Sequence, residues 1–179
     1  MSVAEIINYT YEDYKRWEGD WELIDGMPIA MTPAPMKVHQ NISGTIYREL
    51  ADSLDICDEC EALYEVDWKI AEDTILRPDI LISCHDEDKN YITKSPKLIV
   101  EVISPSTAKK DEKIKYEIYE KEGVNYYILV YPDDLKAKIF RLKDDKYVKV
   151  GDFTKELFTS QNLEYNVDID FEKVFRKFR

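Results

Sequence analysis

Three apolar segments, with a helical pattern between the last two, constrain the fold of this chain most strongly. Segments 75–83, 97–103 and 125–131 are rich in Ile, Leu, Val and Tyr, as is typical of central strands covered on both faces. Residues 107–122 follow a helical repeat, and Gly123 stands where a helix commonly ends in a left-handed residue. A strand, a helix and a second strand in this order predict a crossover between neighbouring parallel strands of one sheet.

Shorter helices and hairpins are expected around these segments. Apolar residues recur every four positions and predict a helix over 37–54, and Asp25-Gly26 predicts the tight turn of a hairpin over 21–29. The remaining expected elements are a helix over 10–17, an alternating strand over 64–70, a hairpin of strands 136–142 and 147–150, and an amphipathic segment over 171–178. The predicted fold class is therefore mixed α/β, with a central mixed β-sheet flanked by helices.

The length and composition fit one domain that spans residues 1–179. A chain of 179 residues can bury one substantial core but not two. No apolar run approaches the ~18 residues of a membrane span, and the start of the chain lacks the basic and apolar regions of a secretion signal. We therefore expect a cytoplasmic protein without membrane contact, in which the three cysteines are reduced.

The cysteines allow one alternative metal site. Cys57 and Cys60 are separated by two residues, and Cys84 is followed directly by His85, so these side chains could together suggest zinc. We favour packing or surface thiols instead. The chain has no second C-x-x-C pair, and neighbouring residues at a strand end tend to point to opposite sides.

Two carboxylates lie within the apolar strand segments. Asp79 follows Pro78 inside 75–83, and Glu101 lies inside 97–103. Carboxylates are rarely buried unless they are paired or hold a metal, so a divalent cation bound between the two is the simplest explanation. The alternative is that both side chains lie at strand ends, in water or in ion pairs.

Lys115 lies on the expected helix, within the apolar stripe that should pack against the sheet. The residues that share its helical face are Asp111, Ile114, Ile118 and Tyr119. Its ammonium group could reach the acidic pair and stabilise charge on a phosphate. We then expect Lys115→Met to abolish activity and to leave the fold stable or slightly more stable, because it removes a buried charge. The alternative is that the long side chain extends along the sheet to water.

A larger set of motifs resembles the restriction-endonuclease-like proteins of the Uma-two family, within the PD-(D/E)XK nuclease superfamily. The resemblance covers about residues 10–142 and is most specific from Glu101 to Val124. The residues that carry it are Trp21-Glu22-Leu23-Ile24-Asp25-Gly26, His39, Pro78-Asp79, the run from Pro96 to Thr107, Asp111, Lys115, Tyr119, Gly123-Val124 and Tyr126-Tyr127.

The resemblance implies a restriction-endonuclease-like core and a metal-dependent endonuclease that acts on the phosphodiester bonds of DNA. Asp79, Glu101 and Lys115 would be the catalytic residues. Mg²⁺ (or Mn²⁺) would be held by Asp79, Glu101 and the backbone carbonyl of Val102. Analogy with related nucleases suggests a homodimer, since two cuts need two sites.

One position departs from the superfamily pattern. The superfamily lysine normally lies two residues after the acid, on the same face of the strand, and here that position is Ile103. Lys115 matches a lysine typical of the Uma-two family and is the substitute. Glu22 would add a third carboxylate, and His39 could touch the site or a phosphate. For His39 a hydrogen-bonded histidine at a helix start is the alternative.

The net charge of −12 counts against a function in DNA binding, because proteins that grip DNA usually present a basic face. Together with Ile103 it supports an alternative, a catalytically silent protein that keeps the nuclease fold as a binding or accessory module. Retention of Asp79, Glu101 and Lys115 favours an active site, because a silent protein has no need for these charges on an apolar surface. A stability shift on titration with Mg²⁺ or Mn²⁺ distinguishes the two.

Overall fold

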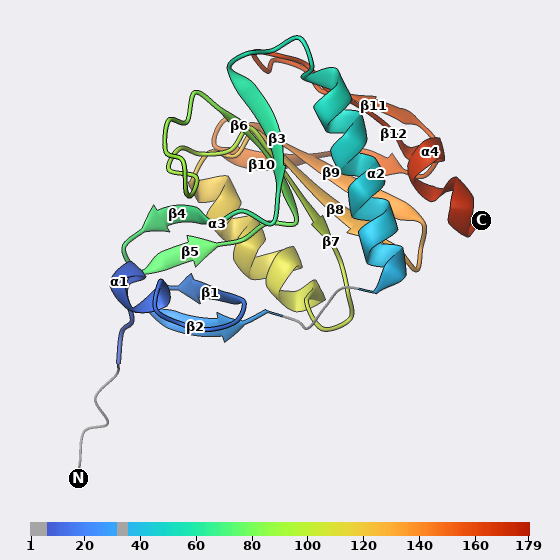
Figure 1. Ribbon diagram of the computed structural model, residues 1–179. Helices are drawn as coiled ribbons and strands as arrows, with labels where there is room; N and C mark the ends of the chain where they lie inside the picture. Colours follow the sequence, from blue (N-terminus) through green and yellow to red (C-terminus); the bar gives the residue numbers. More distant parts are fainter. Residues whose placement is uncertain (1–6, 32–35) are drawn as a thin grey trace.

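The computed structural model describes residues 7–31 and 36–179, and a six-stranded mixed sheet lies at its centre (Figure 1). Its order is β10-β9-β8-β7-β6-β3, with β7 and β8 parallel and the other neighbours antiparallel. The strands are β3 (Cys60–Tyr64), β6 (Ile80–Cys84), β7 (Leu98–Val102), β8 (Tyr126–Tyr131), β9 (Lys136–Lys143) and β10 (Lys146–Phe153). The predictions of a mixed central sheet and of β6, β7 and β8 as neighbours are confirmed.

The crossover between β7 and β8 is a helix that changes its winding along its length. It runs as a π-helix, η1 (Lys110–Lys115), and continues as α3 (Tyr116–Lys121). It packs on one face of the sheet, where the ring of Tyr119 is fully buried. Gly123 then ends the helix with a φ of 78°, as predicted. π-helical turns are rare, and they frequently occur at functional sites.

The opposite face of the sheet is covered by α2 (Lys37–Ser53) and by the C-terminal elements (Figure 1). The apolar stripe predicted for this helix is buried as Ile42, Ile46 and Leu50. The C-terminal elements are β11 (Leu157–Thr159), β12 (Asp168–Asp170), α4 (Phe171–Phe175) and η2 (Arg176–Phe178). The predicted amphipathic segment over 171–178 is helical as α4 and η2, and the short β11–β12 pair that precedes it was not predicted.

A second, smaller sheet of order β2-β1-β5-β4 lies beside the central one (Figure 1). Its elements are β1 (Trp21–Ile24), β2 (Met27–Ala30), β4 (Trp68–Ala71) and β5 (Thr74–Leu76), with α1 (Tyr11–Tyr14) next to them. Asp25 and Gly26 have φ values of 48° and 75°, which confirms the predicted tight turn. A capping box between Thr10 and Asp13 begins α1.

Two predicted strands are wrong, because the chain passes from one sheet to the other within them. Segment 75–83 divides into β5 of the small sheet and β6 of the central sheet, with a break at Pro78, which has no amide hydrogen to donate to a ladder. Segment 64–70 divides into β3 and β4, and the break follows Glu65, whose φ is 49°. Apolar patterns therefore continue across both changes of sheet, as an apolar-rich segment over 75–83 and as alternation over 64–70.

The expectation of reduced thiols is also wrong for two of the three cysteines. Cys60 and Cys84 are directly paired across β3 and β6 and form a disulfide, while Cys57 is free. The disulfide removes two of the thiolates that the zinc alternative required, so that alternative fails. Location in the cytoplasm stays a prediction, and the disulfide counts against it because cytosolic thiols are kept reduced. No helix among the described residues is long and apolar enough to cross a membrane.

Candidate active site

A pocket of about 430 Å³ opens where β7 ends. Its walls come from the start of α2, the turn at 77–79, the loop 103–107 and η1. The predicted site residues that line it are His39, Asp79, Glu101, Val102 and Lys115. Long-range pairing of β6 with β7, and the return of the crossover helix over β7, bring these residues together.

Asp79 and Glu101 point into this pocket from neighbouring strands. Asp79 lies just before β6, and its Oδ2 accepts a hydrogen bond of 2.7 Å from the amide of Val102. The Oε2 of Glu101 in turn lies 3.4 Å from the amide nitrogen of Asp79. Each carboxylate is thus held by the backbone beside the other acid, and the two share one cleft.

Lys115 reaches the same cleft from the π-helical turn and is almost completely buried. Its Nζ lies 2.8 Å from Glu101 Oε1 and 2.8 Å from Glu22 Oε1. The carboxylate of Asp111, one helical turn earlier, is 3.7 Å away. Tyr119 donates a hydrogen bond of 3.0 Å to the same Glu101 oxygen. The side chain therefore does not extend to water, which was the alternative for this residue.

Glu22 is fully buried and joins the small sheet to this cluster. Its Oε2 lies 2.7 Å from the Nζ of Lys110, and its Oε1 also accepts a hydrogen bond of 2.9 Å from the amide of Arg77. Both oxygens are therefore engaged by lysines or backbone. The geometry fits a residue that holds Lys110 and Lys115 in place, rather than a third carboxylate free to bind a metal.

The electrostatics of the site follow from how two lysines are shared among the carboxylates. Burial raises the pKa of Glu22, but Lys115 and Lys110 outweigh it and bring that pKa to about 2. For Glu101 burial prevails, and with the charges of Asp111 and other acids it raises the pKa well above 4.5 despite Lys115. Burial lowers the pKa of Lys115, yet its acidic neighbours raise it well above 10.5 overall, so Lys115 stays charged. Burial is thus the main cause of the raised pKa of Glu101, whereas the surrounding carboxylates are the cause of the raised pKa of Lys115.

The residues present fit a divalent cation. Four carboxylates surround two ammonium groups, those of Lys110 and Lys115, which leaves two excess negative charges when all are ionised and His39 is neutral. Among the described residues, no hydrogen-bond donor contacts Asp79 Oδ1, and Glu101 Oε2 has only the long contact to the Asp79 amide. Carboxylate and carbonyl oxygens are the ligands that Mg²⁺ and Mn²⁺ prefer. Asp79, Glu101 and the carbonyl of Val102 could hold such an ion.

His39 lies at the edge of the same cluster. Its Nε2 is 3.3 Å from Asp79 Oδ2. Burial lowers the pKa of His39, but Asp79, Glu65 and the carbonyl of Val102 outweigh burial and raise it. Its Nδ1 is buried without a hydrogen-bond partner among residues 7–31 and 36–179. The imidazole ring thus contacts Asp79 through Nε2, while its Nδ1 is a buried polar atom without a hydrogen bond among the described residues.

Three residues of the cluster, Lys110, Asp111 and Tyr119, were not predicted as site residues. Lys110 pairs with Glu22, which is 88 positions away, and no local sequence pattern predicts such a pair. Tyr119 lies four residues after Lys115 on the same helical face, so its position was visible in the sequence, although its bond to Glu101 was not.

A separate group of three exposed side chains lies away from this pocket. The ligand atoms of Glu59, His85 and Glu164 lie within 4.8 Å of one another. His85 Nε2 is 2.9 Å from Glu164 and 3.7 Å from Glu59, so the histidine already serves as their partner. Exposed ion pairs of this kind are common on protein surfaces.

Comparisons with known proteins identify the family and the fold of this chain. Residues 11–171 match the model of the Uma2 family, described as "Putative restriction endonuclease". The fold is similar to the crystal structure of "a putative nuclease belonging to DUF820" from Anabaena variabilis ATCC 29413. The TM-score is 0.74 at 17% sequence identity, over 93% of this chain and 97% of that one. No curated protein matches the sequence significantly. The chain therefore has the restriction-endonuclease-like fold and belongs to the Uma2 family of nuclease-type proteins.

Proposed function

We propose that this protein is a metal-dependent endonuclease that hydrolyses phosphodiester bonds of DNA. The observation that carries the proposal is the convergence of Asp79, Glu101 and Lys115 in one pocket, where four carboxylates surround two lysines. Membership of a family of restriction endonucleases supports a nuclease, while the metal and the DNA substrate are our own extension. Mg²⁺ or Mn²⁺ is the proposed cofactor, bound by Asp79, Glu101 and the carbonyl of Val102.

When bound, the cation would activate a water molecule and stabilise negative charge on the phosphate. The protein's own residues prepare the site for this chemistry. Glu22 and Glu101 fix the ammonium group of Lys115, which orients the attacking water and opposes charge that develops on the phosphate. Tyr119 donates its hydrogen bond to Oε1 of Glu101, which leaves Oε2 of the same carboxylate directed at the cleft.

Lys110 is assigned the contact to the phosphate backbone. Its side chain is 18% exposed, whereas that of Lys115 is 3% exposed, so Lys110 is the more accessible of the two lysines that line the pocket. A local lysine of this kind can bind a phosphate even though the chain as a whole carries a charge of −12. We also propose that the protein acts on duplex DNA as a homodimer, because two cuts need two sites.

The test is cleavage of supercoiled plasmid in Mn²⁺ or Mg²⁺ by the wild-type chain and by Asp79→Asn and Glu101→Gln. Each variant should lose activity by at least roughly 100-fold, because it removes a metal ligand. Glu61→Gln is the matched control, since Glu61 is an exposed glutamate on β3 and should retain full activity. Equal cleavage by Glu101→Gln and the wild type would show that the pocket is not the source of the activity.

A second candidate function is a catalytically silent binding module. It is favoured by the saturation of Lys115, whose ammonium group is already paired with Glu22 and Glu101. Such a protein would bind DNA with or without metal and would not cut it. Absence of cleavage combined with metal-independent DNA binding would establish this candidate in place of the nuclease.

A further inference from the structure

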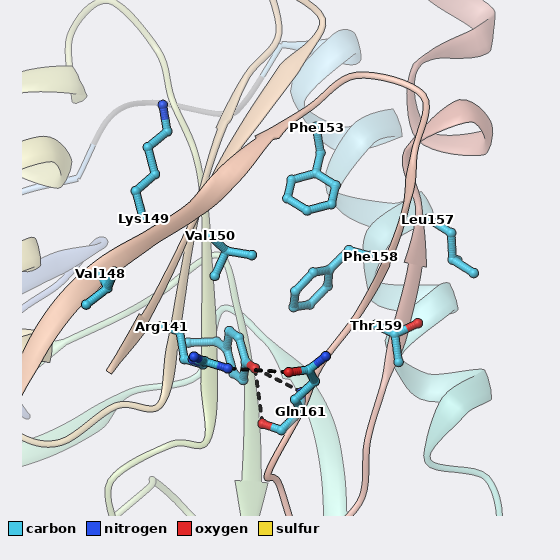
Figure 2. A pocket seen from close by; sticks show the side chains of 10 residues that line it. Arg141, Val148, Lys149, Val150, Phe153, Leu157, Phe158, Thr159 and Gln161 are labelled. Atoms are coloured by element: carbon cyan, nitrogen blue, oxygen red, sulfur yellow. Dashed lines mark hydrogen bonds between the residues drawn. The ribbon is translucent and has the colours of Figure 1, made fainter. Parts of the chain in front are cut away.

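A second pocket, of about 400 Å³, lies between the β9–β10 hairpin and β11 (Figure 2). Arg141 of β9, which lines it, is directly opposite Tyr126 of β8. The ring of Tyr126 belongs to the core beneath α2, whereas that of Tyr127 belongs to the core beneath the crossover helix. This pocket therefore opens on the face of the sheet opposite to the site of Glu101, and the proposed nuclease chemistry does not use it.

Apolar side chains form the walls of this pocket. Val148 and Val150 are large apolar side chains that line it, and they are 49% and 48% exposed. Behind them, the rings of Phe153 and Phe158 meet edge to face with centroids 5.7 Å apart. Figure 2 shows Val150, Phe153 and Phe158 around one hollow. Exposed apolar groups gathered at a hollow are typical of a binding site.

Polar groups form the base of the pocket and are fixed by hydrogen bonds. The hydroxyl of Tyr126 donates to the carbonyl of Gln161 at 3.1 Å and accepts from its amide at 2.9 Å. Arg141 Nη1 makes one long hydrogen bond of 3.4 Å to Gln161 Oε1, and Arg141 forms no ion pair with the described residues. A guanidinium group has five N–H donors, so most of those of Arg141 remain available to a ligand.

The charge of the lining differs from that of the rest of the chain. The protein has 37 acidic residues in 179, yet none of the ten residues that line this pocket is acidic. Two of the ten, Arg141 and Lys149, are basic, and Lys149 is paired with Asp152 at 2.9 Å. A hollow with apolar walls and one arginine that has no ion pair among the described residues, in a chain of net charge −12, is complementary to an apolar group that carries a negative charge.

We propose that this pocket binds a small amphipathic anion. Its carboxylate, sulfonate or phosphate group pairs with Arg141, and its aromatic or branched aliphatic body packs between Val150, Phe153 and Phe158. Arginine suits this role because its planar group can form two parallel hydrogen bonds to such an anion. The bound molecule would lie on the opposite face of the sheet from the metal-binding residues.

The test uses two fluorescent probes of nearly equal shape and different charge. The anion is 8-anilinonaphthalene-1-sulfonate, and the neutral analogue is N-phenyl-1-naphthylamine; each is titrated into the folded chain of residues 1–179. Arg141→Met should lower the affinity for the sulfonate probe by about tenfold and leave the affinity for the neutral probe unchanged. Val150→Asp should lower the affinity for both probes, because it places a negative charge in the apolar wall. Arg48→Met is the matched control, since Arg48 is exposed on α2 and does not line the pocket.

Near-ultraviolet circular dichroism of each variant establishes that the probes report on folded protein, because the sulfonate probe also binds loosened states. Sulfonate binding that is equal for the wild type and Arg141→Met would overturn the proposal, as would no binding at all. Analytical ultracentrifugation of the wild type and of Val150→Asp measures the oligomeric state. If the wild type is a dimer and Val150→Asp is a monomer, the hollow is an interface between two copies and the small-anion proposal is wrong.

Discussion

On β7, Val100 and Glu101 are neighbours in sequence and lie on opposite faces of the central sheet. Val100 packs in the apolar core beneath α2, whereas Glu101 is buried beneath the crossover helix with Lys115 and Tyr119. Burial of apolar groups stabilises a fold directly, while burial of charges is costly unless they neutralise one another. The buried groups of the α2 face thus serve stability, whereas the crossover face also keeps charged groups, whose retention the proposed chemistry at the pocket would explain.

Removal of Lys115 is expected to have the largest effect on the crossover face. The sequence alone suggested that Lys115→Met would leave the fold stable or slightly more stable, but its ion pairs reverse that expectation. The substitution leaves buried carboxylates without their shared cation and should cost about 3–5 kcal/mol at neutral pH, with loss of cleavage. Urea unfolding measures the difference.

Lys113→Met is the control for that experiment, because Lys113 is exposed on the same helical turn. It should change the free energy of unfolding by less than about 0.5 kcal/mol. A Lys115→Met variant as stable as the wild type would mean that the acids of the cluster are protonated in the folded protein.

On the α2 face, Ile128→Ala should affect stability alone. Ile128 is fully buried in the apolar core, so its truncation leaves a cavity and should cost about 2–5 kcal/mol. Cleavage per folded molecule should stay at the wild-type rate, measured well below the unfolding temperature. Loss of cleavage in a folded Ile128→Ala variant would show that the two faces are coupled and would break the comparison.

Glu22 should make the stability of the crossover face depend on pH. Its pKa falls from 4.5 to about 2 on folding, so its contribution of about 3 kcal/mol is present above pH 4.5 and is lost as the pH falls from 4.5 towards 2. Glu22→Gln should therefore be less stable than the wild type at neutral pH, and the two should converge in acid. A difference that stays constant between pH 7 and pH 2 would contradict this assignment.

Metal binding is expected to give the smallest of these effects. Mg²⁺ or Mn²⁺ at a hundred times its dissociation constant should stabilise the wild type by about 2.7 kcal/mol. Asp79→Asn should abolish the shift, because it removes a proposed ligand, whereas Val100→Ala should retain it. An equal shift in Asp79→Asn would place the bound ion elsewhere, with the exposed group of Glu59, His85 and Glu164 as the first alternative.

Local patterns in the sequence determined much of this fold. The fourfold repeat of apolar residues predicted α2, and Asp25-Gly26 predicted the turn between β1 and β2. The strand–helix–strand order predicted the parallel pair β7–β8, and helical spacing put Lys115 on the side of the crossover that faces the sheet. These features could be predicted because each depends on residues within a few positions of one another.

Only the tertiary structure decided which distant segments meet. An apolar-rich segment cannot show that the chain changes sheets at Pro78, because β5 and β6 are both buried at every position and so have the same composition. The Cys60–Cys84 disulfide depends on the register of β3 against β6, and the Glu22–Lys110 pair joins residues 88 positions apart. Such contacts are set by how strands and helices pack against one another, and a single sequence carries no local signal of that packing.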